Sequence, residues 1–97
     1  YGLYVFRFDE RLVATLLQIA RYDEGVYDVI DMVTESDHVL ALSQILMTAD
    51  YGGDITRAAM YLSAGEAALA RGQYTLAIRY FGLAWQQAYN AMPFAFE

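Results

Sequence analysis

The chain has 97 residues, of which 58% are hydrophobic and 19% charged, and its formal net charge is −6. This is the size of one domain, and its apolar content excludes an intrinsically disordered chain. No apolar run reaches the roughly 18 residues of a membrane-spanning helix, and the absence of Cys excludes disulfides and thiolate chemistry. The negative charge argues against a nucleic-acid partner.

Both ends of the chain are apolar and aromatic. Residues 1–8 read Tyr-Gly-Leu-Tyr-Val-Phe-Arg-Phe, which predicts a short extended segment. Residues 92–97 form an apolar tail. Free termini are usually polar, so we expect both ends to dock on this domain or on a neighbour. We therefore expect a soluble protein that joins a larger assembly, with a homo-oligomer as one form. The compartment stays open, and export with a removed leader is compatible with a start at Tyr1.

Helical periodicity begins after residue 8. Leu12, Leu16 and Ile19 recur at helical spacing and predict a helix over 10–22. Asp9 is a suitable N-cap for this helix, and Gly25 lies beyond its expected end.

Two further helices are expected in the middle of the chain. Apolar residues at i, i+3, i+4 and i+7 predict a short helix over 26–33. The polar segment 34–37 is expected to interrupt it and to cap a second helix, which ends near Ala49. Residues 50–54 have the composition of a turn.

The last two helices have the clearest signals. Asp54 is expected to cap an Ala-rich helix over 55–71, and Gly72 to end it. A sustained apolar stripe predicts a final helix over 74–91, which Pro93 stops. The short connection makes these helices antiparallel neighbours. The predicted fold is an all-α bundle of four to five helices, with a single helical domain over 9–91 and a hairpin over 55–91.

The negative charge is concentrated in the middle of the chain. Residues 23–54 hold eight carboxylates and no Arg: Asp23, Glu24, Asp28, Asp31, Glu35, Asp37, Asp50 and Asp54. Such a band is either a solvated face or a docking surface for a basic partner.

The C-terminal hairpin resembles a tetratricopeptide repeat, a helix–turn–helix of about 34 residues with fixed small and large positions. The resemblance covers residues 58–90 and rests on the turn Gly72-Gln73-Tyr74 together with Tyr61, Gly65, Ala77, Phe81 and Ala84. Gly65 and Ala77 are expected to face each other, because only small side chains let two helices pack closely. Ala64, Ala68 and Tyr89 depart from the family pattern, and Pro93 comes four residues late. The resemblance implies that the hairpin binds a peptide or protein face on its concave side.

No arrangement of residues indicates catalysis. His38 is the only imidazole, and without Cys or a second His it makes a poor metal site. The turn Asp50–Asp54 lacks the alternating acids of a calcium loop. We therefore expect no enzyme activity, no cofactor and no metal; a small-molecule or metal carrier between the helices is a further alternative.

Two sets of residues are singled out around the aromatic side chains. We assign hairpin packing to Tyr61, Gly65, Ala77, Phe81, Ala84 and Trp85. Seven other aromatic residues suit a partner-binding surface, because they combine a large contact area with a low entropy cost. This set is Tyr4, Phe6, Phe8, Tyr80, Tyr89, Phe94 and Phe96.

These features favour a non-enzymatic protein–protein interaction module that serves as an accessory or scaffold subunit of a larger assembly. The alternative is a structural helical segment of a larger enzyme or secreted multidomain protein, with no ligand of its own.

Overall fold

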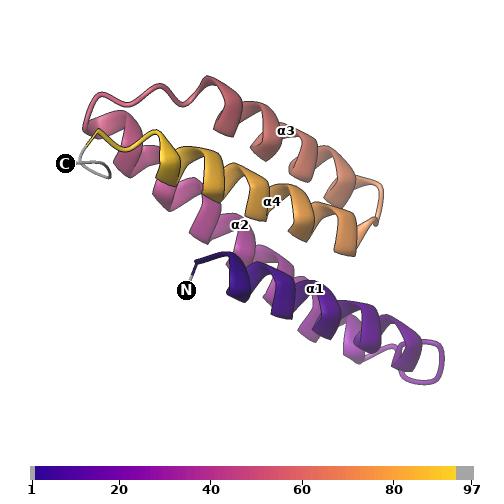
Figure 1. The fold of residues 1–97 in the computed structure, drawn as a ribbon. Coiled ribbons are helices and arrows are strands. Elements are labelled where there is room, and N and C mark those ends of the chain that lie inside the picture. The colour runs from indigo at the N-terminus through magenta and orange to yellow at the C-terminus, as the bar shows by residue number, and fades with distance from the viewer. Residues whose placement is uncertain (1, 94–97) are drawn as a thin grey trace.

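Four α-helices make up the part of the chain that the structure describes, residues 2–93 of a computed structural model. They are α1 (Gly2–Ile19), α2 (Val26–Asp50), α3 (Thr56–Ala70) and α4 (Tyr74–Asn90), shown in Figure 1. The described residues contain no strand, so the all-α prediction is confirmed, with four helices.

Helix α4 is the centre of the bundle, because each of the other helices packs against it. Helix α2 runs parallel to α4: Tyr27 lies beside Tyr74 at one end, and the Thr48 hydroxyl donates to the Ala88 carbonyl at the other (2.8 Å). Helices α1 and α3 run antiparallel to α4 (Figure 1). The pairing of Phe6 with Trp85 fixes the register of α1.

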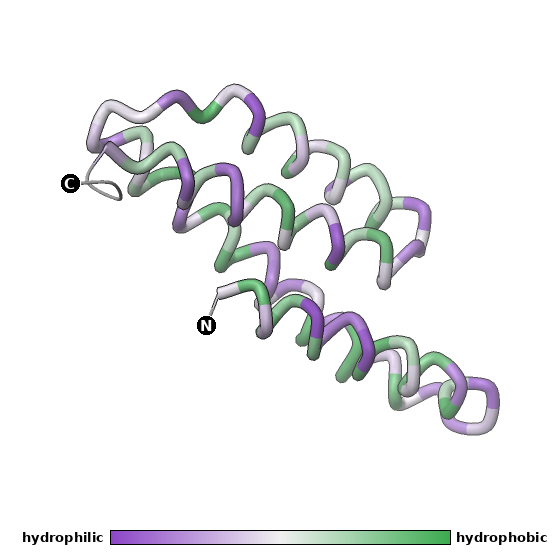
Figure 2. The backbone as a smooth tube through the Cα atoms, in the orientation of Figure 1, coloured by the Kyte–Doolittle hydropathy of each residue, from purple (hydrophilic) through white to green (hydrophobic). Residues whose placement is uncertain are grey.

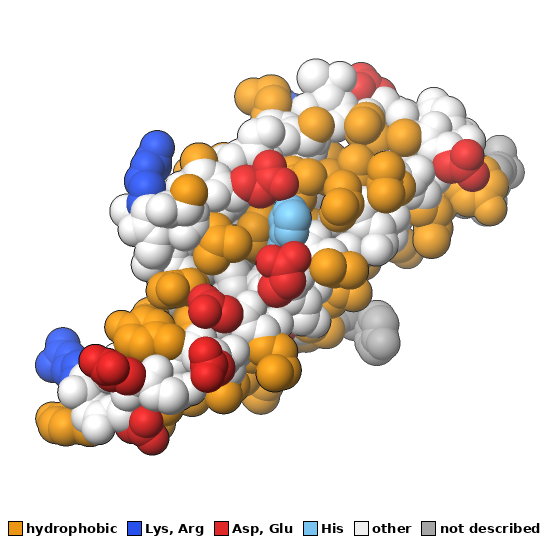
Figure 3. All heavy atoms as spheres, turned by 180° about the vertical axis from the view of Figure 1, so that it is seen from behind, with side chains coloured by type: hydrophobic (Ala, Val, Ile, Leu, Met, Phe, Trp, Pro, Cys, Tyr) orange, Lys and Arg blue, Asp and Glu red, His pale blue; other side chains and the backbone are white. Residues whose placement is uncertain are grey.

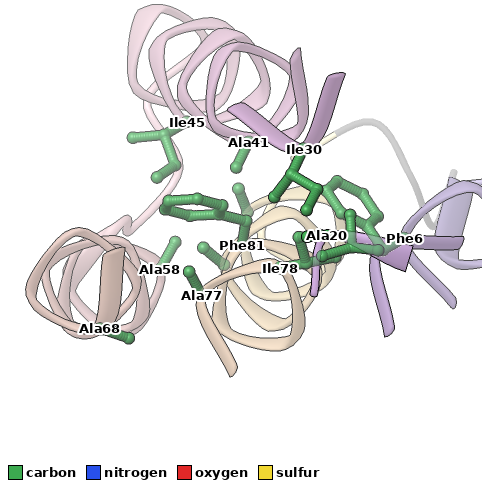
Figure 4. Close-up of a cluster of buried hydrophobic side chains, with 13 residues drawn as sticks. Phe6, Ala20, Ile30, Ala41, Ile45, Ala58, Ala68, Ala77, Ile78 and Phe81 are labelled. Carbon is green, nitrogen blue, oxygen red and sulfur yellow. The ribbon is translucent and has the colours of Figure 1, made fainter. Parts of the chain in front are cut away.

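The core is built around Phe81 of α4, whose side chain is fully buried. Figure 4 shows its ring between α2, which contributes Ala41 and Ile45, and α3, which contributes Ala58. On the other side of α4, Ile78 packs with Phe6 of α1 in the same cluster. Since a single helix supplies both sides of the core, its loss would remove most of the contacts between helices.

Two glycines let the neighbouring helices approach α4 closely. A Cβ added at Gly65 of α3 would lie 2.5 Å from Phe81 Cε1 and 3.3 Å from the Ala77 carbonyl oxygen. A Cβ added at Gly82 of α4 would lie 3.0 Å from Phe6 Cβ. Neither position has room for a side chain unless the neighbouring ring or helix moves.

The N-terminal prediction was wrong. Residues 2–8 are not extended; they form the first turns of α1. Leu3, Phe6 and Val13 continue the helical period, and Phe6 and Val13 are buried. Packing against α4 therefore overrides the β propensity of the aromatic residues. Asp9 lies inside the helix and is not its N-cap.

The predicted break at residues 34–37 was also wrong. Helix α2 runs for 25 residues without interruption. The Thr34 hydroxyl donates to the Ile30 carbonyl (2.7 Å) within the helix, and both Thr34 and Asp37 are buried. These polar side chains face inward instead of capping a new helix.

The ends of α2 and α3 use the same turn. Gly52 and Gly72 have φ values of +86° and +73°, the left-handed region that favours glycine. In each case the following residue donates its N–H to a carbonyl five residues back: Gly53 to Thr48 (2.9 Å) and Gln73 to Ala68 (2.9 Å). Asp54 lies two residues before α3 and accepts hydrogen bonds from the backbone and hydroxyl of Thr56. These two bonds lower the pKa of Asp54.

The fold is elongated, with extents of 50 × 24 × 15 Å. Its radius of gyration is 14.1 Å, against about 12.5 Å for a compact chain of this length. Figure 2 shows hydrophilic residues concentrated in the connection between α1 and α2, whereas hydrophobic residues occur along all the helices. In so thin a molecule each outer helix keeps a long face away from α4.

We predict that Gly65→Leu destabilises the protein, because the new side chain has to displace the Phe81 ring. The expected loss is about 2 kcal/mol of unfolding free energy in urea titrations, after the gain in helix propensity. Ser63→Leu, at an exposed position of the same helix, is the matched control and should stay within about 0.5 kcal/mol of the native protein. Equal stabilities for the two variants would contradict the packing described.

Candidate functional site

Helix α2 is unusual because it carries polar side chains on its buried face and large apolar side chains on its exposed face. Three of the six residues on its buried face are polar; the six are Ile30, Thr34, Asp37, Ala41, Ile45 and Thr48. Large apolar side chains lie exposed at positions between them: Val29, Met32, Val39, Leu40, Leu46 and Met47. We call these six exposed residues the α2 outer face.

The α2 outer face has the spacing of a helix–helix contact. Met32, Val39 and Leu46 recur every seven residues, with side chains that are 70%, 52% and 61% exposed. Leu40 and Met47 each lie one position further along the helix. A seven-residue apolar repeat keeps one stripe toward a partner helix. Much of this stripe stays exposed, since α4 packs against the opposite side of α2.

Negative charge lies next to the stripe. Asp28, Asp31 and Glu35 are exposed on the N-terminal half of α2, and no Arg occurs between residues 21 and 57. Figure 3 views the molecule from the side on which α2 lies and shows acidic groups interspersed with hydrophobic ones. A ligand for this face would need apolar and basic groups together.

His38 links α2 to α3. Its Nε2 lies 2.9 Å from Glu66 Oε2, and its Nδ1 lies 3.5 Å from Glu35 Oε1. Its ring lies 5.0 Å from the ring of Phe81. Figure 3 shows the imidazole between two carboxylates. The contacts make His38 a structural link between helices rather than a residue at a helix start.

Asp37 is a fully buried carboxyl group on the inward face of α2, and neither oxygen has a hydrogen-bond donor in its ionised form. Burial, together with the neighbouring carboxyl of Asp9 on α1, raises its pKa to about 9. At neutral pH Asp37 therefore carries a proton, which it can donate to Asp9.

We predict that this group makes the protein less stable as pH rises. Unfolded Asp37 ionises near 3.8 and the folded group near 9, so folding takes up a proton between these values. Stability is retained at low pH and declines as the pH rises across this window. Asp37→Asn should make the stability less dependent on pH and should raise the stability at pH 8.

Urea unfolding between pH 4 and pH 9 measures this difference, with Asp50→Asn at the exposed end of α2 as the control. The native protein and Asp37→Asn should have the same stability near pH 4 and should diverge above it. A difference between native protein and Asp37→Asn that is constant across pH would contradict the assignment.

The described residues among those predicted to bind a partner are distributed over α1 and α4. Tyr4 and Phe8 are exposed one turn apart on α1, and Tyr89 is exposed on α4, stacked on Trp85 with ring centroids 5.1 Å apart. Phe6 was wrongly placed in this set: it is 3% exposed and belongs to the core. Tyr80 is half-buried near Tyr61. Phe94 and Phe96 lie outside the described residues.

The residues assigned to hairpin packing lie at the contact between α3 and α4, except Trp85, which was wrongly assigned. Gly65 meets Phe81 and the Ala77 backbone, and Ala84 is buried. Tyr61 is half-buried on α3. Trp85 turns to the other side of α4, where its ring lies 6.2 Å from that of Phe6.

Sequence reasoning missed the α2 outer face because it divided this segment into two short helices with a break at 34–37, so a repeat that runs across the break was not followed. The available signal was the seven-residue recurrence of Met32, Val39 and Leu46, combined with polar residues at the positions that would complete an apolar inner stripe.

Within residues 2–93 no three His, Asp or Glu side chains gather closely enough to hold a metal ion. In the same range, no helix has the length and apolar character needed to cross a bilayer. Comparison of the chain with protein-family models, with curated proteins and with solved structures found no match.

Proposed function

We propose that the chain is a protein-interaction module that binds a helix of its partner along the α2 outer face. The observation that supports this proposal best is the exposed apolar stripe on a helix whose opposite side already packs on α4. Monomeric proteins rarely expose a large apolar patch without a use for it, and six large apolar side chains are exposed on this one face. An accessory or scaffold role follows from such a surface.

The partner helix is amphipathic and basic. The stripe extends from Val29 to Met47, about 27 Å at 1.5 Å per residue, which a helix of roughly 18 residues would cover. Asp28, Asp31 and Glu35 lie beside it and favour Lys or Arg on the partner. A second copy presents the same acids and no compensating Arg on α2, so like charges oppose self-pairing.

The energetics suit a specific but reversible contact. Burying an exposed Leu or Met side chain completely contributes about 1.5–3 kcal/mol, and ordering the partner helix opposes this gain. Met47 and Met32 add flexible side chains that adapt to a partner surface. We expect a dissociation constant in the micromolar range, of the order of 10 μM.

The hairpin of α3 and α4 supports the same class of function through its resemblance to a tetratricopeptide repeat. Its α4 side is not free, because α1 and α2 cover it. The outer face of α2 is therefore the better candidate for the contact surface, and the hairpin serves as its support.

Two synthetic peptides test the proposal. Both are 18-residue helices with the same leucine stripe; one carries Lys and Arg beside the stripe and the other Glu. The basic peptide should bind at micromolar concentration in calorimetry, weaken as NaCl rises, and exceed the acidic peptide at least tenfold. Equal affinities for the two peptides, or no binding of either, would contradict the proposed partner chemistry.

Variants locate the contact. Leu46→Glu and Val39→Glu should each lower the affinity for the basic peptide about tenfold or more, because a charge replaces an apolar contact. Met60→Glu, at a position on α3 that is 67% exposed, is the matched control and should bind normally. A similar loss in all three variants would point to general charge effects and away from the α2 outer face.

A further inference from the structure

The groove between α1 and α4 is a second feature that the proposed function does not use. One part is a hollow of about 260 Å³ with an apolar wall formed by Leu3, Phe6 and Leu83. It adjoins a wider hollow of about 450 Å³ that includes Arg7, Arg11 and Arg79. Arg7, Glu10 and Arg79 line both hollows, so they form one groove.

Positive charge is concentrated in this groove. The chain has six Arg, and three of them line it, whereas Glu10 is its only carboxylate. Glu10 accepts hydrogen bonds from Nε and Nη2 of Arg79, which fixes that guanidinium across the groove. Arg7 and Arg11, one turn apart on α1, make no ion pair with any described carboxylate. The groove therefore carries a net positive charge in a protein of net charge −6.

The apolar wall follows from the close approach of the two helices. Gly82 lies against Phe6 and adds no side chain to the space between Leu3 and Leu83. The side chains of the apolar wall line only the smaller hollow and Arg11 only the wider one, and the shared charged groups, Arg7 and Arg79 among them, lie where the two hollows join. A mostly apolar hollow with a few fixed polar groups is the usual form of a small-molecule site.

We propose that this groove binds a small anionic amphiphile, a carboxylate on a short acyl chain. The carboxylate would lie between Arg7 and Arg11, where it can accept charge-assisted hydrogen bonds from both guanidinium groups. The acyl chain would lie along Leu3, Phe6 and Leu83. The α2 outer face lacks Arg and favours a cation, so the two sites select ligands of opposite charge.

Straight-chain carboxylates are the probe. Octanoate should bind in two-dimensional NMR titrations with a dissociation constant below about 1 mM. From butanoate to octanoate each added methylene should raise the affinity about threefold to fourfold, and longer chains should gain less because the hollow is finite. Octanol and octylammonium should bind at least tenfold more weakly than octanoate.

Variants separate the two ends of the groove. The double substitution Arg7→Gln with Arg11→Gln should lower the affinity for octanoate about tenfold and leave the affinity for octanol unchanged. Leu83→Trp should weaken both by filling the hollow. Arg57→Gln with Arg71→Gln on or next to α3 is the matched control and should leave octanoate binding unchanged.

Three results would each overturn the proposal: no octanoate binding, equal binding of octanoate and octanol, or full octanoate affinity in the Arg7 and Arg11 variant. Binding of the basic peptide is measured separately on the same variants. Failure of octanoate binding can therefore be distinguished from failure of the contact at the α2 outer face.

Discussion

The structure depends on the packing of α4, which contacts all three other helices. The contacts are possible because the crowded positions are small: Gly65 receives the Phe81 ring, and Gly82 lies against Phe6. Larger residues at either place would separate the helices and leave voids that close-packed interiors do not tolerate. The other three helices pack chiefly on this one helix, so the molecule is thin and each of them keeps a face that α4 does not cover.

For function, the important consequence is that α2 packs on α4 by one side and leaves its opposite side exposed. A helix of 25 residues that packs on α4 through Ile30, Ala41 and Ile45 still exposes a stripe of six large apolar side chains. Three of its polar residues, Thr34, Asp37 and Thr48, face the interior, where Thr48 donates to the Ala88 carbonyl and Asp37 meets Asp9. Burying these polar side chains costs stability, as the raised pKa of Asp37 indicates. A partner bound to the outer side would bury the stripe, which the fold alone leaves exposed to solvent.

The sequence allowed some elements to be predicted well, and the reasons are physical. The hairpin was clear because Ala-rich propensity, Gly72 and the stripe around Phe81 all agree. The start of α1 was not predicted, since the aromatic residues of segment 1–8 favour strands. Only packing against another helix, here α4, makes them helical. The continuity of α2 was missed because Thr34 and Asp37 have the composition of a cap. The α1–α4 groove could not be predicted, because Arg7 and Arg79 meet only through tertiary packing.

Methionine oxidation tests the central claim, that the α2 outer face is covered by a partner in the native assembly. Met32 and Met47 lie on that face, and Met60 is similarly exposed on α3. Dilute peroxide should oxidise all three in the purified chain, because exposed thioethers react readily. In the native extract the account predicts severalfold slower oxidation of Met32 and Met47, with Met60 unchanged, by peptide mass spectrometry. The same oxidation rates for all three residues in both samples would contradict it.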